Sequence, residues 1–190
     1  MRLVSSQRPG VEPARGPVGR GRRRGERDGQ SLVEFSLILT PLFLILLGIV
    51  QFGFIFNAYV TMTNAAREAA REGSIYVYDR TLTKDQNDLL RNERIRSSLL
   101  ASMNLLGKTS PQFATGATWT KSGLTFTNGD LRVTYLIPAS VTDSDPRTGQ
   151  RVTVRATYHL DLIVPLISNL LPKDAGGRLV LTGEVTMVIN

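Results

Sequence analysis

The chain has 190 residues, enough for one modest domain with accessory segments, and its net charge of +7 is concentrated near its start. Residues 1–28 hold eight arginines and three acidic residues, a net charge of +5, so the rest carries only +2 and gives no electrostatic reason to expect a nucleic-acid partner. The absence of cysteine excludes disulfides and thiolate chemistry. The single histidine, His159, argues against a zinc site, and we expect neither a metal nor a cofactor.

Residues 1–28 are rich in arginine, glycine and proline and contain almost no large apolar side chains. Such a stretch cannot bury enough apolar surface to offset its ordering entropy, so we predict that it is disordered. It could bind nucleic acid or acidic lipid. The favoured interpretation is a cytoplasmic flank that orients the membrane segment after it.

A long apolar run follows this basic segment. From Phe35 to Phe56 no residue is charged, and at 1.5 Å per residue a helix over this run is roughly 33 Å long, enough to cross the hydrocarbon core of a bilayer. The arginines precede the run and no comparable basic cluster follows it. The positive-inside rule therefore places the N-terminus in the cytoplasm and the body of the chain outside. Pro41 could kink this helix.

The helix is predicted to continue into water over residues 57–73, giving one element about 40 residues long. Small and apolar residues recur there at helical spacing and suit packing against a sheet or another helix; they are Ala58, Met62, Ala65, Ala66 and Ala69. Glu68 and Arg71 are placed for an i,i+3 ion pair, and Gly73 is a candidate C-cap.

A second amphipathic helix is predicted over residues 84–106, after an irregular stretch at 74–83. Thr83 is its expected N-cap and Gly107 its expected C-cap. The expected apolar stripe consists of Leu89, Leu90, Ile95, Leu99, Leu100, Met103 and Leu106.

After this helix the apolar period changes from 3.6 to 2, which indicates strands. Asn128-Gly129 between two β-rich runs predicts a two-residue hairpin, and residues 152–164 and 179–189 alternate apolar and polar side chains. One apolar face and one polar face are typical of an antiparallel sheet covered on one side by helices. The predicted fold class is therefore α+β, with a long transmembrane helix that continues into a small extracytoplasmic domain. Residues 165–171, between the last two strands, are expected to form a short helix or an exposed docking patch.

The sequence contains no catalytic motif that rises above background, and we predict no catalytic residues and no enzymatic activity. His159 is expected on the polar face of a strand near Arg155 and Asp161, where a surface histidine is favoured over a general base. Asp143 to Asp145 hint at a calcium loop but lack the spacing of an EF-hand, so a solvated turn is favoured.

The unexpected charge is Glu34, a lone carboxylate at the start of the apolar run and five residues after Gly29. A basic leader, a glycine, four residues, a glutamate, an aromatic residue and an apolar helix together resemble the type IV prepilin signal. More narrowly, residues 29–73 resemble the TadE-like family, the pseudopilins of tight-adherence pilus systems. The motifs that carry this resemblance are V-E-F, T-P, G-I-V-Q-F-G and N-A-A-R-E-A-A-R.

The resemblance implies that a prepilin peptidase cleaves the chain between Gly29 and Gln30. Residues 1–29 would then be a removed leader, and the mature chain would have 161 residues. In that organisation residues 30–73 form the transmembrane helix with its soluble extension, and residues 74–190 form the extracytoplasmic domain.

The resemblance also assigns a role to Glu34 and its neighbour Phe35, the pairing and recognition of subunits. Cleavage creates a new α-amine at Gln30, and the glutamate is expected to pair with such an amine, often on a neighbouring subunit. Pairing offsets the cost of a bare charge in lipid and fixes the stagger between helices. The implied partners are other pilin or pseudopilin subunits, the prepilin peptidase, the assembly platform in the membrane and the lipid bilayer of the cytoplasmic membrane.

The leading hypothesis is a non-enzymatic, membrane-anchored pseudopilin or minor pilin that takes part in tight-adherence pilus assembly or secretion. The alternative is an uncleaved single-pass membrane protein whose outward-facing domain binds a ligand or partner. A weaker hypothesis is a membrane-tethered hydrolase that uses His159 and Asp161. The state of the N-terminus separates the first two hypotheses, and alanine at the two polar residues tests the third.

Overall fold

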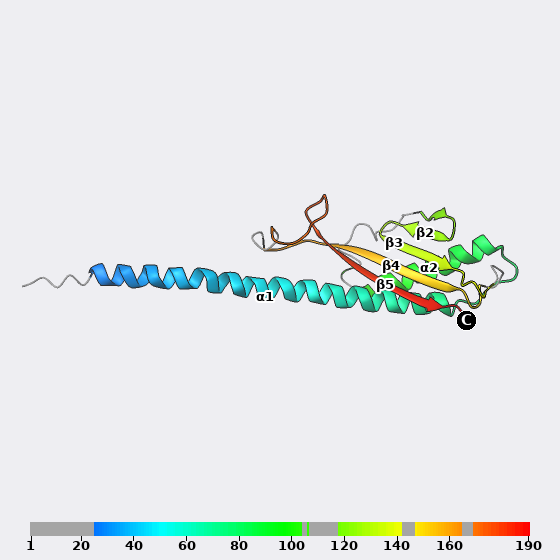
Figure 1. The fold of residues 1–190 in the computed structure, drawn as a ribbon, viewed down its shortest axis with the longest axis horizontal. Coiled ribbons are helices and arrows are strands. Elements are labelled where there is room, and N and C mark those ends of the chain that lie inside the picture. The colour runs from blue at the N-terminus through cyan, green and yellow to red at the C-terminus, as the bar shows by residue number, and fades with distance from the viewer. Residues whose placement is uncertain (1–24, 104–105, 107–117, 142–146, 165–168) are drawn as a thin grey trace, which may run out of the picture. The chain divides into compact units, whose positions relative to one another are not determined.

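The structure, a computed structural model, describes residues 25–103, 106, 118–141, 147–164 and 169–190 (Figure 1). Helices α1 (Gly25–Ser74) and α2 (Lys84–Met103) precede five strands: β1 (Thr120–Ser122), β2 (Thr125–Asn128), β3 (Leu131–Leu136), β4 (Arg151–Leu160) and β5 (Leu179–Val188). Contacts divide the chain into a first unit over residues 1–43 and a second unit over residues 44–190, so α1 contributes to both. A long apolar N-terminal helix, a second helix and an antiparallel sheet confirm the predicted α+β, pilin-like fold class.

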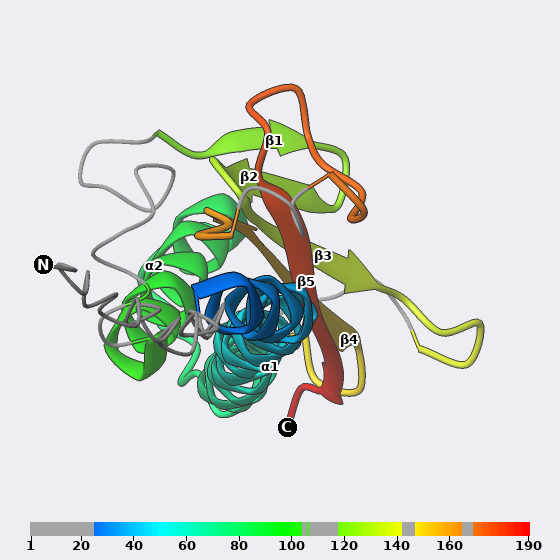
Figure 2. The same cartoon turned by 90° about the vertical axis from the view of Figure 1, so that its left-hand side faces the viewer.

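Within the second unit α1 packs through the small residues that the sequence singled out. Its buried stripe consists of Ala58, Met62, Ala65, Ala66, Ala69 and Ala70. This stripe meets the sheet at Gly183 of β5, where a Cβ would lie only 2.9 Å from the backbone oxygen of Met62. The absence of a side chain at Gly183 therefore lets the helix backbone approach the strand closely. Both helices lie on the same face of the sheet (Figure 2).

The C-terminal end of α1 differs from the prediction at Gly73. The helix continues to Ser74, and Gly73 has no positive φ, so it is not a left-handed cap. It is buried, and a Cβ there would lie 2.6 Å from Cδ1 of Ile95 on α2. Its small size permits helix packing. The predicted ion pair is present, with Nη2 of Arg71 at 3.0 Å from Oε1 of Glu68.

The sheet is an antiparallel meander with strand order β1-β2-β3-β4-β5. The predicted hairpin is confirmed with its turn shifted by one residue. Asn128 pairs with Leu131, and the loop consists of Gly129, with a φ of 57°, and Asp130. The short strand β1 was not predicted.

Strand β4 is shorter than predicted and ends at Leu160. It is followed by a connection to β5 that leaves the regular sheet. Residues 165–168 of the predicted patch lie outside the described residues, and Leu170 beyond them is 83% exposed.

Helix α2 begins with a capping box, because the N–H of Thr83 donates to Oε1 of Gln86 at 2.9 Å and the N–H of Gln86 lies 3.3 Å from Oγ1 of Thr83. The expected C-cap Gly107 lies outside the described residues. The predicted apolar stripe is wrong in its first half, where Leu89 and Leu90 are exposed. The buried residues of that half are polar, namely Asn87, Asp88, Arg91 and Asn92.

Candidate functional site

The four residues of the predicted processing and pairing site lie together on α1, within the first unit. Gln30 and Glu34 are four residues apart, so their side chains share one helix face. The side-chain amide of Gln30 donates through Nε2 to Oε1 of Glu34 at 3.0 Å. The glutamate carboxylate thus lies beside the residue whose α-amine a cut after Gly29 would release. Phe35 is exposed next to it.

Gly29 has no role that the surrounding fold explains. A Cβ built there meets no atom within 4 Å, and φ is not positive. Glycine inside a helix costs about 1 kcal/mol relative to alanine, so the local structure would tolerate or prefer alanine. The peptide bond between Gly29 and Gln30 lies within the helix, because α1 begins at Gly25.

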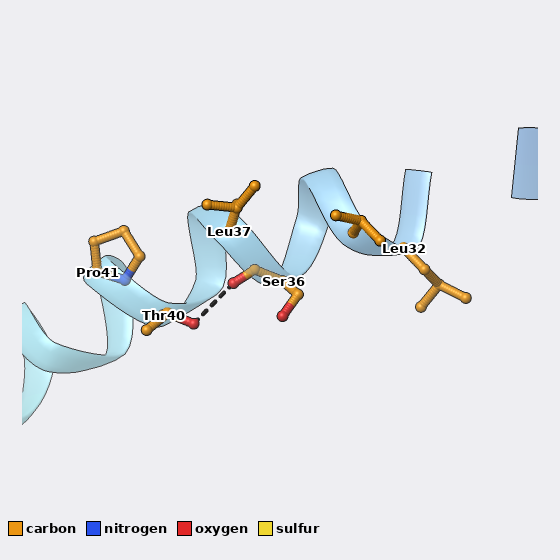
Figure 3. Close-up of a pocket in the computed structure, with 6 residues that line it drawn as sticks. Leu32, Ser36, Leu37, Thr40 and Pro41 are labelled. Carbon is orange, nitrogen blue, oxygen red and sulfur yellow. Dashed lines mark hydrogen bonds between the residues drawn. The ribbon is translucent and has the colours of Figure 1, made fainter. Parts of the chain in front are cut away.

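A shallow apolar groove lies on the surface of α1, lined by residues that precede and follow Glu34 in the sequence (Figure 3). Its lining residues are Leu32, Val33, Ser36, Leu37, Thr40 and Pro41. The hydroxyl of Thr40 donates to the carbonyl of Ser36 at 2.9 Å, while Pro41 has no N–H to offer the carbonyl of Leu37. Small hydroxyl residues within an apolar surface are typical of the places where membrane helices pack against each other.

In the second unit, Gln51 of α1 holds a segment that lies far from it in sequence. Its side chain is 1% exposed, and its Oε1 accepts the N–H groups of Ile163 at 2.9 Å and Val164 at 3.1 Å. Both donors belong to the connection between β4 and β5. Gln51 is the one amide in the uncharged run of residues 35–56, and that signal was available from the sequence and was missed.

A buried polar cluster occupies the other end of the second unit. Arg147 donates two hydrogen bonds of 2.8 Å to the carboxylate of Asp88 and one of 2.7 Å to Gln150. The guanidinium carbon of Arg147 lies 4.4 Å from the ring centre of Tyr135. Burial raises the pKa of the Tyr135 hydroxyl above its ordinary value, and this group donates to Asn92 at 2.7 Å.

The solvated turn expected at Asp143 to Asp145 lies outside the described residues. Arg147 and Gln150, which follow it, are buried. Because the acid and base of the cluster are shielded from solvent and engaged with each other, the cluster suits a structural role.

His159 has two partners that the sequence did not indicate. Its Nδ1 lies 2.6 Å from Oδ2 of Asp174, and its Nε2 lies 3.3 Å from Oδ2 of Asp130. The predicted neighbour Asp161 is exposed. Since both ring nitrogens face carboxylates of the chain itself, the histidine joins the β2–β3 turn to the β4–β5 connection. The pKa of Asp174 is lowered, first by the backbone N–H of Arg178, with a further contribution from His159.

Comparison with known proteins gives one match, to the family model described as TadE-like protein, over residues 29–71. The matched segment begins at the predicted processing site and includes Glu34, Phe35 and Gln51. It leaves α2 and the whole sheet outside. No curated protein and no solved structure matches the chain.

Proposed function

Since residues 29–71 give the chain a TadE-like N-terminal region, we propose that it acts as a non-enzymatic, membrane-anchored pseudopilin or minor pilin in tight-adherence pilus assembly. The family match suggests involvement in this process. Helix α1 is long and apolar enough to cross a membrane, by length and composition. The proposed partners are other pilin-type subunits, a prepilin peptidase, the membrane assembly platform and the cytoplasmic membrane. Residues 74–190 would lie outside that membrane.

Processing is the first part of the proposal, and Gly29 carries it. Cleavage after this residue would remove residues 1–29 together with their net charge of +5. Because no neighbouring atom of the chain requires glycine at this position, the open space around Gly29 supports a requirement set by the peptidase. A protease must accommodate an extended backbone at the bond that it cuts, and glycine is the residue that leaves a helix at the smallest cost.

Pairing is the second part, and the 3.0 Å hydrogen bond between Gln30 and Glu34 is the observation that carries it. An ammonium group at the start of the mature chain would lie about one helical turn from the carboxylate. In lipid, a neighbouring subunit's amine is an equally strong partner, because an unpaired carboxylate is expensive there. A pair between subunits would set their relative stagger.

One observation favours a second candidate, an uncleaved single-pass protein whose outer domain binds a partner. The backbone on both sides of the Gly29–Gln30 bond is helical, because α1 begins at Gly25. Cleavage therefore requires this turn to unwind at the peptidase, whereas an uncleaved anchor requires no such change.

The intact mass of the membrane-extracted, C-terminally tagged protein separates the two candidates. In a host with a working prepilin peptidase we expect the mass of residues 30–190. Gly29→Ala should retain the leader, whereas Gly53→Ala is the matched control. Gly53 lies in the same helix with equally open surroundings, so its variant should be processed normally. A full-length wild-type mass in that host would refute processing.

A further inference from the structure

The second unit covers α1 before the uncharged run of the helix has ended. Gln51 and Ala58 are buried on the face that meets the sheet and its connections. On the other faces of the same turns the helix is apolar and exposed, at Ile49, Phe52 and Phe56. Residues 51–56 thus contact protein on one side and present a lipid-like surface on the other.

Helix length decides where this shared stretch lies relative to the bilayer. If the membrane ended before Gln51, the uncharged helix from Phe35 to Val50 would be about 24 Å long, short of the hydrocarbon thickness of about 30 Å. The full run to Phe56 reaches roughly 33 Å. A span made of the uncharged run alone, with Glu34 at its inner edge, therefore places Gln51 and the backbone bonded to it within the outer part of the bilayer.

The connection between β4 and β5 has the composition that this position requires. Residues 162–172 contain no charge, and the exposed charges Asp161 and Lys173 bracket them. Ile163 is 66% exposed and Leu170 is 83% exposed. Figure 1 shows the described parts of this connection, drawn in orange, beyond the end of β4 and outside the regular sheet.

The hydrogen bonds of Gln51 satisfy its amide oxygen and two backbone N–H groups, while its buried Nε2 has no hydrogen-bond partner within the described residues. Non-helical backbone is tolerated at membrane depth only where protein groups satisfy it, and Oε1 of Gln51 accepts the N–H groups of Ile163 and Val164. In return, these donors satisfy an amide oxygen that would be costly on a bare helix in lipid.

We propose that the β4–β5 connection inserts its apolar side chains, Ile163 and Leu170, into the outer half of the bilayer beside α1, with Gln51 as its anchor. The partner is the acyl-chain region of the lipid. This inference rests on the proposed membrane span of α1 and adds a second membrane contact. It restricts the orientation of the outer domain on the membrane surface while the subunit is in the bilayer.

The natural absence of cysteine permits a direct test in the full-length protein. Single-cysteine variants Ile163→Cys and Leu170→Cys carry an environment-sensitive fluorophore in phosphatidylcholine vesicles with spin-labelled lipid. Ile45→Cys reports the span itself. Val77→Cys is the matched control, an apolar loop residue that is 77% exposed and lies in the α1–α2 connection, at the other end of the second unit.

We expect spin-labelled lipid to quench the fluorophore at Ile163→Cys and at Leu170→Cys. Before labelling, these two cysteines should react with a membrane-impermeant maleimide about tenfold or more slowly than the cysteine of Val77→Cys, because apolar side chains at these positions are transferred out of water. Adding Gln51→Leu should keep quenching at Ile45→Cys and reduce it at Ile163→Cys.

Four results would overturn the inference or one of its parts. Quenching at Ile45→Cys alone would refute the inserted connection and leave the span intact, whereas no quenching at Ile45→Cys would refute the span and the insertion with it. Protection at Ile163→Cys that appears only as the protein-to-lipid ratio rises, without quenching, would assign the surface to a second copy of the chain. Unchanged quenching in the Gln51→Leu background would remove Gln51 as the anchor.

Discussion

Replacing Arg147 by alanine tests whether the buried polar cluster holds the outer domain together. The substitution removes a guanidinium that makes two 2.8 Å hydrogen bonds to Asp88 and one of 2.7 Å to Gln150. The side chains of the ion pair are 3% and 1% exposed, so water cannot replace the lost partner.

Removing one member of a buried ion pair typically costs about 3–5 kcal/mol, because the other charge is left without compensation. A domain of this size has a free energy of unfolding of about 5–15 kcal/mol, so the loss is a large fraction of the total. Asp88→Ala should cost at least as much. Nη1 of Arg91 lies 3.7 Å from the same carboxylate, and two buried cations would then lose their counter-charge.

The single tryptophan provides the assay. Trp119 packs against the core, and its Nε1 donates to Glu93 of α2 at 2.9 Å, so its fluorescence reports denaturant unfolding of the outer domain in detergent. The matched control is Arg155→Ala, which breaks an exposed pair with Glu184 at 3.7 Å. Surface pairs contribute about 0–1 kcal/mol, so this variant should unfold almost like wild type.

If Arg147→Ala and Arg155→Ala shift the unfolding midpoint equally, the reasoning about the cluster is refuted. A double variant distinguishes charge from packing. Asp88→Leu with Arg147→Met should recover much of the lost stability, since apolar replacement of a buried pair is often neutral. Recovery will be incomplete because Arg91 still lacks its partner.

Glu34→Ala should be processed normally but give few or no pili, because the amine of Gln30 loses its partner; intact mass and electron microscopy check this, and normal pili would exclude the pairing role. Gly183→Ala should destabilise the outer domain by about 1–3 kcal/mol in the tryptophan assay, because its Cβ would lie 2.9 Å from the oxygen of Met62. The lowered pKa of Asp174 predicts stability that is complete above the ordinary aspartate value of about 3.9 and is lost as pH falls through the lowered value. Asp174→Asn should flatten that acid dependence in thermal melts, and an unchanged dependence would contradict it.

The sequence by itself determined the features that depend on local period and spacing. The uncharged run of residues 35–56 is recognised by its length, and the alanine stripe and the alternating strands repeat at the period of their own element. The contact between Gln30 and Glu34 is likewise local, since residues four apart meet on a helix without help from the rest of the chain.

Only the tertiary structure decided which polar residues are buried. An amphipathic pattern favours Leu89 and Leu90 as the inner face of α2, yet Asp88 is inside because Arg147 lies opposite it, 59 residues later in the chain. The side-chain oxygen of Gln51 likewise accepts a hydrogen bond from a backbone N–H more than a hundred residues away. A buried charge or amide is stable only when its partner is present. Which polar residue is buried therefore depends on a partner far away in the sequence, and the apolar period of a single helix does not indicate that partner.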